Sequence, residues 1–494
     1  MTADSYPLSG DPWLPDQEAA PPSKLSRLGL AFWVFFLNFL IVGYLAGGKS
    51  FAYLGIPQAK VFIGEIFLVG FVVAKPGAFF NTWVTSLVTR HPLAVFAWAH
   101  LAFLGYGLFE TLRGISLGYQ AAAAVLNLVF NVYPVYVFIG FWFARKVPGI
   151  LERMIPMIAL VAGIYGLAYV GGLSKYTGSY LIPGTNVSMI GQSGGAVISI
   201  LGLIILGKKG FYHTFLILIN VLTLLGNQVR GDWLGFLVGF VVWGAVSGNM
   251  RKVFRVGTIL TSLVLVGFIT DVRLPGVSTR GGETSIRDMV GRGLAGIDKE
   301  TAREYSKDVD AFAGTLEWRK KWWREIWIAV HSSLENTFLG LGYGFTLTNL
   351  VTYIGESALR SPHSVFYYTL GYSGWVGVFL FTYFQVATFY AIWAVFRRTH
   401  QSLGLAIFVA TLVAASAGNL LETPFGAIPF YTIVGMCLAQ QKQDESSDAQ
   451  LDDVPVNFHA PYPATANEMS PWPAFGETRQ LGPASKSLWP TERM

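Results

Sequence analysis

Long apolar runs, each bounded by charged residues, glycine or proline, constrain this chain more than any other feature. About 20 mostly apolar residues are needed for a helix to cross the hydrocarbon core of a bilayer, and the chain has many runs near that length. Of its 494 residues, 53% are hydrophobic and only 13% are charged, whereas soluble proteins have about 25% charged residues. The sequence therefore predicts an all-α integral membrane protein.

Twelve runs are predicted to be transmembrane helices. They cover residues 28–47, 57–75, 91–109, 121–144, 154–173, 187–207, 211–227, 231–248, 253–271, 372–396, 402–419 and 425–440. A long polar interval separates the ninth run from the tenth and is the one extramembrane piece long enough to fold. The predicted organisation is helices 1–9 within 28–271, a helical loop domain at 272–362, and helices 10–12 within 363–440.

Both ends of the chain are predicted to be disordered. Residues 1–27 are polar and contain five prolines, and residues 441–494 are acidic at first and then rich in proline. Segments of this composition bury too little apolar surface to fold. We therefore expect a disordered tail at each end.

The distribution of basic residues predicts the orientation in the membrane. Lys and Arg gather in alternate short loops, such as Arg145 with Lys146 and Arg397 with Arg398. Because short cytoplasmic loops carry an excess of Lys and Arg, these loops and both termini are expected to be cytoplasmic. The loop domain 272–362 is then expected on the opposite, outer face.

One segment of the loop domain is predicted to be an amphipathic helix. Residues Glu317–Val330 place Trp318 and Trp322 on one stripe and Arg319 and Trp323 on another. Trp-rich helices of this kind lie in or near a membrane interface.

Arg230 is the first candidate for chemistry. It lies in a tight outer turn, Gly226–Trp233, between the seventh and eighth runs. An arginine is unusual there, because Lys and Arg are enriched in the short loops on the cytoplasmic side. A guanidinium binds phosphate oxygens through two parallel hydrogen bonds. The alternative is an arginine that reaches the interface and pairs with Asp232.

Arg319 is the second candidate, because it stands with Lys320, Lys321 and Arg324 among the tryptophans of the loop helix. One interpretation is a cradle for an anionic substrate with stacking surfaces beside it. The other is an interfacial helix whose basic face contacts lipid phosphates. The residues alone do not separate the two.

Two further segments of the loop are candidates. Gly340–Phe345 has three alternating glycines, which permit positive φ and close backbone approach, although an ordinary loop explains it better. His363 lies where the loop re-enters the membrane. A histidine there can accept a proton from an acceptor hydroxyl, and the alternative is a histidine that caps the next helix.

Three more ionisable residues lie within apolar runs: Glu65, His100 and Glu110. Such groups usually face the protein interior. Glu110 is near the outer end of the third run and could line the same cavity, and Glu65 and His100 could equally be structural hydrogen-bonding partners. The chain has no metal-ligand motif, so no metal or other cofactor is predicted. It has a single cysteine, Cys437, so no intramolecular disulfide is predicted.

The order of these segments carries a resemblance to a known family. An Arg-Gly-x-Trp turn at 230–233 comes first, and a long loop follows with an Arg-x-x-x-Trp helix at 319–323. The loop continues through Asn336–Phe345 and closes with Pro362–Gly377. Over about 211–396 the chain resembles the O-antigen ligase and polysaccharide polymerase superfamily of bacterial membrane proteins.

The resemblance implies a reaction, a fold and a location. Members of the superfamily take a glycan from a polyprenyl diphosphate, usually undecaprenyl diphosphate, and transfer it to a hydroxyl of a second molecule without a metal. The fold resembles the GT-C-like architecture of membrane glycosyltransferases. The implied location is the bacterial inner (cytoplasmic) membrane, with the active site on the periplasmic face. The implied partners are the lipid-linked donor, a glycan or glycolipid acceptor, membrane lipid and polysaccharide assembly proteins, and no nucleic acid is expected.

Position in the family pattern also implies roles for individual residues. Arg230 and Arg319 would bind the diphosphate and His363 would orient or deprotonate the acceptor hydroxyl, so these three are the predicted catalytic residues. The predicted substrate-binding residues are Trp318, Arg324, Gly342, Tyr343, Gly344 and Ser364. Ser364 stands where many relatives have Asn, and Asp232 stands where a small or neutral residue is common.

Two other functions stay open at this point. A flippase or transporter of lipid-linked oligosaccharides is expected to carry charges along a path through several helices, whereas here they gather on one side and in one loop. A non-catalytic scaffold of a polysaccharide assembly complex would tolerate loss of Arg230 and His363. Polymerase and ligase share the same motifs, and the long tails only slightly favour the polymerase or exopolysaccharide branch.

Overall fold

The computed structural model describes residues 24–56, 61–88, 91–183, 187–207, 210–277, 284–295, 298–306, 309–351 and 361–440. The predicted C-terminal tail lies outside these residues. Most of the predicted N-terminal tail also lies outside the described residues. The exception is residues 24–27, which are helical and begin the first helix.

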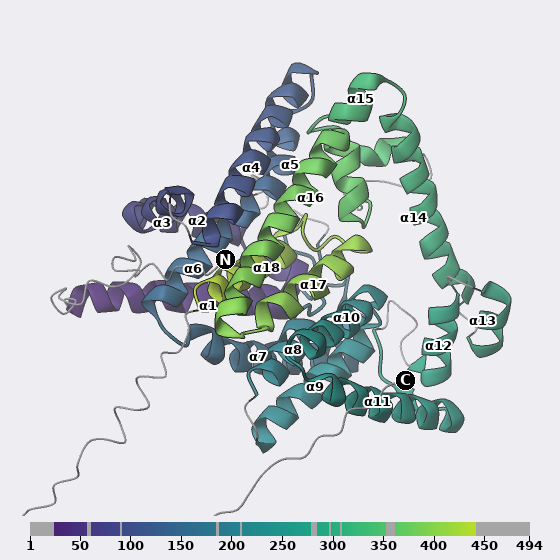
Figure 1. Ribbon diagram of the computed structural model, residues 1–494. Coiled ribbons are helices and arrows are strands. Elements are labelled where there is room, and N and C mark those ends of the chain that lie inside the picture. Colours follow the sequence, from purple (N-terminus) through teal and green to yellow (C-terminus); the bar gives the residue numbers. More distant parts are fainter. Residues whose placement is uncertain are drawn as a thin grey trace, which may run out of the picture. The chain divides into compact units, whose positions relative to one another are not determined.

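Helices make up almost all of the described regular structure (Figure 1). Before the loop domain they are α1 (Lys24–Ala52), α2 (Ile63–Ala74), α3 (Pro76–Val88), α4 (Leu93–Ser116), α5 (Ala121–Val132), α6 (Tyr136–Lys146), α7 (Ile150–Gly171), α8 (Ala196–Ile205), α9 (Phe211–Asn227), α10 (Arg230–Val246) and α11 (Met250–Thr270). Short 3-10 turns, η2 (Tyr133–Val135) and η3 (Leu173–Tyr176), follow α5 and α7.

The loop domain is helical, as predicted, with one minimal strand pair at its start. Strands β1 (Arg273–Leu274) and β2 (Thr284–Ser285) pair antiparallel, with Arg273 opposite Ser285. The helices are α12 (Ile286–Leu294), α13 (Lys299–Tyr305), α14 (Val309–Val330) and α15 (Leu334–Leu339), followed by the 3-10 turn η5 (Leu347–Leu350). The final helices are α16 (Val365–Thr399), α17 (Leu403–Ser416) and α18 (Pro424–Leu438).

The predicted count of twelve membrane spans is not confirmed, although each predicted run overlaps a helix. Within the described ranges, six helices are long and apolar enough to cross a bilayer, or seven if the bent pair α2–α3 is one span. Helices α8, α9, α17 and α18 are apolar but have only 10–17 residues, which is short of the roughly 20 that a simple span needs. The chain is nevertheless a multi-pass membrane protein by its apolar helices.

Helix α3 is a feature that the hydropathy pattern did not predict. The chain bends by 93° between α2 and α3, and the bend falls at Lys75, which has non-helical torsions and precedes Pro76. A residue before proline is disfavoured in the helical region, whereas proline itself is well suited to the first position of a helix. The local Lys-Pro sequence therefore ends one helix and starts the next.

Helix α16 is broken near its N-terminal end, and the break organises the loop domain. Gly374 has a φ of 60° within the helix, so carbonyl groups just before it lose their usual helical donors. The carbonyl of Gly371 accepts a hydrogen bond from the amide of Leu341 at 2.9 Å, and that of Tyr372 accepts one from the amide of Gly342 at 3.1 Å. The glycine run thus docks backbone to backbone on the broken helix.

The close approach at this break requires glycine on both sides. Gly340 has a φ of 71°, and a Cβ atom added there would lie 2.5 Å from the amide nitrogen of Gly374. The third freed carbonyl, of Ser373, accepts a hydrogen bond from the hydroxyl of Tyr106 in α4 at 2.8 Å. Helix α16, the glycine run and α4 therefore form one hydrogen-bonded junction.

We predict that Gly340→Ala destabilises the protein by about 2 kcal/mol or more, because alanine there has both an unfavourable φ and a backbone collision. Thermal unfolding of the purified protein in detergent measures this as a lower Tm. Gly293→Ala in α12 is the control, since a Cβ at Gly293 meets open space at an ordinary φ. Equal melting temperatures for the two variants would contradict the role assigned to the junction.

Candidate active site

Arg230 begins α10, directly after the turn that ends α9. Gln228 closes α9 in the left-handed region, with a φ of 57°, and its side-chain oxygen accepts a hydrogen bond from Arg292 of α12. Arg292 is 4% exposed. Burial, and then the positive charge of Arg292, lower the pKa of Arg230. A second arginine, which the sequence did not single out, therefore stands close to the predicted one.

Arg319 lies in the middle of α14 and faces the end of α17. Its guanidinium donates a hydrogen bond to the carbonyl of Ala417, just after α17, at 3.2 Å. Gly231, next to Arg230, faces the same end of α17, because a Cβ on it would lie 3.5 Å from the carbonyl oxygen of Ala414. The carboxyl end of a helix carries partial negative charge, which suits arginine. Arg319 and the first turn of α10, which begins at Arg230, thus lie at the same end of α17.

His363 lies beside Arg319, with Trp318 between them. The ring centroids of His363 and Trp318 are 6.0 Å apart, and the guanidinium carbon of Arg319 lies 5.7 Å from the Trp318 ring centroid. Burial, and then the positive charge of Arg319, lower the pKa of His363 to about 4. The imidazole is therefore neutral near pH 7 and able to accept a proton.

His363 is held in an unusual backbone conformation. Its φ is 53°, which is uncommon for a residue other than glycine. Its amide donates a hydrogen bond to the hydroxyl oxygen of Ser361 at 3.3 Å, and Trp323 of α14 donates its indole N–H to the carbonyl of Pro362 at 2.8 Å. These contacts tie the histidine to the helix that carries Arg319.

Glu422 is a residue of this site that the sequence analysis missed. It lies between α17 and α18, and one carboxyl oxygen accepts a hydrogen bond from the hydroxyl of Ser361 at 3.4 Å. No described residue donates to its other oxygen, which is buried. Burial raises the pKa of Glu422 to about 8, so the carboxyl group is mostly protonated at neutral pH. A lone carboxyl group beside apolar runs was the signal that could have identified it.

Trp318 and Ser364 are the predicted substrate-binding residues nearest to this centre. Trp318 is half-buried and lies between Arg319 and His363. Ser364 is 3% exposed and occupies the position before the first residue of α16. Binding of substrate by either side chain stays a prediction.

The other predicted binding residues are not brought to this centre. Arg324 is exposed and follows Arg319 by five positions, which turns it about 140° away around α14. Tyr343 is 1% exposed, and its hydroxyl donates to Asn131 of α5 at 2.6 Å. Added Cβ atoms at both neighbouring glycines, 342 and 344, would approach Tyr119. Their contacts are with the helices of the protein, and a role in binding stays a prediction.

Two of the ionisable residues in the apolar runs have structural partners. His100 shares a hydrogen bond with the carbonyl of Asn131 at 3.1 Å. Glu65 accepts hydrogen bonds from the hydroxyl of Tyr133 and the amide of Phe62, both at 3.0 Å. These contacts match the structural alternative stated for them.

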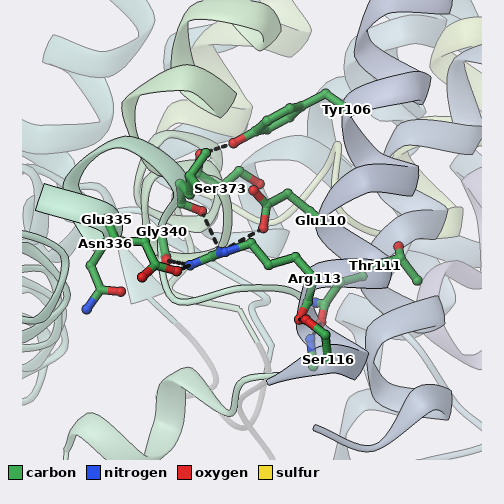
Figure 2. Close-up of polar contacts among 12 residues, drawn as sticks. Tyr106, Glu110, Thr111, Arg113, Ser116, Glu335, Asn336, Gly340 and Ser373 are labelled. Atoms are coloured by element: carbon green, nitrogen blue, oxygen red, sulfur yellow. Dashed lines mark hydrogen bonds and ion pairs between the residues drawn. The ribbon is translucent and has the colours of Figure 1, made fainter. Parts of the chain in front are cut away.

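Glu110 belongs to a cluster near the C-terminal end of α4 (Figure 2). Arg113 donates hydrogen bonds to Glu110 and to Glu335 of α15, each at 3.0 Å, and to the carbonyls of Leu339 at 3.2 Å and Gly340 at 3.1 Å. Glu110 is fully buried, whereas the side chain of Glu335 is 62% exposed. Arg113 therefore fastens α15 and the glycine run to α4, which supports the loop that carries the site.

Residues 215–382 match the model of a family described as O-antigen ligase. No curated protein matches the chain. Within the described ranges, no group of three His, Cys, Asp or Glu residues is arranged to hold a metal ion. The matched segment includes Arg230, Arg319 and His363, and ends before Glu422.

Fold and site together define the class of protein. It is a multi-pass helical membrane protein with a basic site where its long loop domain meets the helices. More particularly, the chain carries an O-antigen ligase domain, and the resemblance drawn from the ordered motifs is confirmed. This domain supports glycan transfer by a ligase or polymerase, with a lipid-linked glycan donor and a glycan acceptor.

We predict that Arg113→Gln destabilises the protein by about 3 kcal/mol, because it leaves Glu110 buried without its charge partner. Glu335→Gln is the matched control and costs under about 1 kcal/mol, because that carboxylate is mostly exposed. Thermal unfolding in detergent measures both. Adding Glu110→Gln to Arg113→Gln recovers part of the loss, and no recovery would show that the buried charge is not the cause.

Proposed function

We propose that this protein transfers a glycan from a polyprenyl diphosphate, such as undecaprenyl diphosphate, to an acceptor hydroxyl at the outer face of the bacterial inner membrane. It acts as a polysaccharide polymerase or an O-antigen-type ligase. The observation that carries the proposal is that Arg319 and the helix start at Arg230 both lie at the end of α17, with a neutral His363 close to Arg319.

The two arginines stabilise the leaving group. When the acceptor oxygen attacks C1 of the donor sugar, the bond from C1 to the phosphate oxygen breaks and the diphosphate leaves with the electron pair. Preorganised guanidinium groups stabilise the charge that grows on its oxygens. Arg292 lies close enough to influence Arg230 electrostatically and adds positive charge on the same side.

His363 takes the proton from the acceptor hydroxyl. Its low pKa in the free protein depends partly on the charge of Arg319. A bound diphosphate offsets that charge, so the pKa of His363 rises and the imidazole becomes a stronger base once the donor is in place. Donor binding thus prepares the base for the acceptor.

Glu422 is a positioning residue in this scheme. It holds Ser361, and Ser361 in turn holds the backbone of His363. A protonated Glu422 carries no charge, so it does not compete with the diphosphate for Arg319. Its burial favours that neutral state.

The orientation is part of the proposal. The basic short loops favour cytoplasmic termini and an outer loop domain, and transfer at the outer face needs a donor whose lipid has already crossed the membrane. The acceptor decides between ligase and polymerase, and the slight preference for the polymerase branch stays a prediction.

We predict that Arg230→Ala, Arg319→Ala and His363→Ala each lower transfer about 100-fold or more, the loss expected when a group that stabilises the leaving oxyanion or a general base is removed. A complementation assay in the native host at matched membrane levels measures surface polysaccharide and polyprenyl-diphosphate-linked glycan. Lipid-linked glycan should accumulate on the outer face. Single stalled repeats identify a polymerase, and long stalled chains identify a ligase.

Arg303→Ala is the matched control in that assay, because Arg303 is an exposed arginine of the same loop domain, on α13, and is paired with Glu300. If all three site variants behave like this control, the transferase proposal fails in favour of a scaffold. Lipid-linked glycan trapped on the inner face would instead identify a flippase.

We predict a pH profile for kcat/KM that reports His363 in the free protein. Because the base must be unprotonated and its pKa is about 4, the wild type keeps its rate from pH 7 to about pH 5. Arg319→Gln removes a positive charge and raises the pKa of His363, so the residual activity falls at a higher pH. In the control variant Arg303→Gln, kcat/KM is expected to fall at the same low pH as in the wild type. If kcat/KM of Arg319→Gln also falls at the wild-type pH, the charge of Arg319 does not lower the pKa of His363.

A further inference from the structure

The turn between α14 and α15 exposes a group of large apolar side chains. We call residues 327–338 the elbow. Within it, Trp327 is 42% exposed, Ile328 51%, Leu334 80% and Phe338 55%. Such a patch is unfavourable in water, at roughly 25 cal/mol per Å² of apolar surface, and marks a contact with another apolar medium.

Helix α16 sets the level of the elbow relative to a bilayer. Its cytoplasmic end is marked by the basic pair Arg397 and Arg398. From Trp375 to Phe396 the helix has 22 residues, which at 1.5 Å per residue make about 33 Å. The hydrocarbon core of a bilayer is about 30 Å thick. Trp375 therefore lies at the outer boundary of the hydrocarbon core.

The elbow lies at that same boundary. The ring centroid of Trp327 is 6.1 Å from that of Trp375, and α15 packs on α16 where Gly340 meets the break at Gly374. Helix α4 gives independent evidence for this level. Gly114 lies near the outer end of α4, which is a candidate span, and packs against the backbone of Tyr343. Figure 1 shows α15 beside the end of α16.

The exposed side chains of the elbow continue a lipid-facing stripe. On α16, Trp375, Phe379 and Tyr383 follow one another at helical spacing and are 37%, 68% and 47% exposed. Because α16 is a candidate membrane span, this stripe faces lipid. Because Trp327 contacts Trp375, the apolar surface of the span is continuous with that of the loop domain.

We infer that the apolar side chains of the elbow, Trp327, Ile328, Leu334 and Phe338, insert into the outer leaflet of the membrane and contact bilayer lipid. The loop domain is thus a membrane-anchored element and not a freely hydrated one. The anchor lies eight residues, about 12 Å of helix, beyond Arg319 on α14, so it holds that arginine close to the bilayer surface. The inference rests on α4 and α16 as spans and does not depend on the proposed transfer reaction.

Site-directed labelling tests this placement. The single cysteine, Cys437, is buried, so Cys437→Ala gives a background for one introduced cysteine at a time: Leu334→Cys, Phe338→Cys, or Glu300→Cys as the exposed loop control. Each is labelled with an environment-sensitive fluorophore and reconstituted in nanodiscs of phosphatidylethanolamine and phosphatidylglycerol. The measurements are quenching by spin-labelled lipid and by aqueous iodide.

The expected result is quenching by the lipid probe at least about threefold stronger at positions 334 and 338 than at 300, with iodide giving the reverse order. Equal iodide quenching at all three positions overturns the inference. Hydroxyl-radical footprinting of the unmodified protein in nanodiscs is the second measurement. Leu334 and Phe338 should be protected from oxidation, and strong oxidation of these two residues overturns the inference as well.

Discussion

The break in α16 at Gly374 is the constraint on which the loop domain depends. A helix that spans a membrane normally satisfies its own backbone, and here a break leaves carbonyl groups that need donors from elsewhere. The amides of Leu341 and Gly342 supply two of these donors, and the hydroxyl of Tyr106 supplies a third. Because the run that meets these carbonyls also lies against Arg113 of α4, the loop domain is fastened to two candidate spans at one junction.

The geometry of the candidate active site follows from elements that this junction holds. Arg319 lies in the middle of α14, and the chain that continues from it through α15 meets the junction at Gly340. His363 comes just before the broken helix and is tied to α14 through the indole of Trp323. Partial burial, and then the nearby positive charge of Arg319, lower the pKa of the imidazole. The same proximity makes the basicity of His363 sensitive to whatever anion Arg319 binds.

Hydropathy and motif order predicted the helical class and the resemblance to the O-antigen ligase family, whereas the roles of Arg230, Arg319 and His363 stay predictions. They did not predict the bend after α2, because a hydropathy profile averages over the Lys-Pro step that causes it. They also suggested a ligand-binding role for Tyr343, whose side chain is buried in contact with Asn131. A glycine-rich turn has the same sequence whether it approaches a ligand or another backbone, so only the tertiary contacts distinguish the two.

The sequence by itself determined that this chain is a multi-pass helical membrane protein with an O-antigen ligase domain, because apolar run length and ordered motifs are local properties of the chain. Only the tertiary structure decided that Glu422 stands behind His363 and that Arg292 stands beside Arg230. It also decided that the apolar elbow lies against Trp375 of α16. These relations join residues far apart in the chain, and their energies depend on burial and distance, which no local pattern encodes.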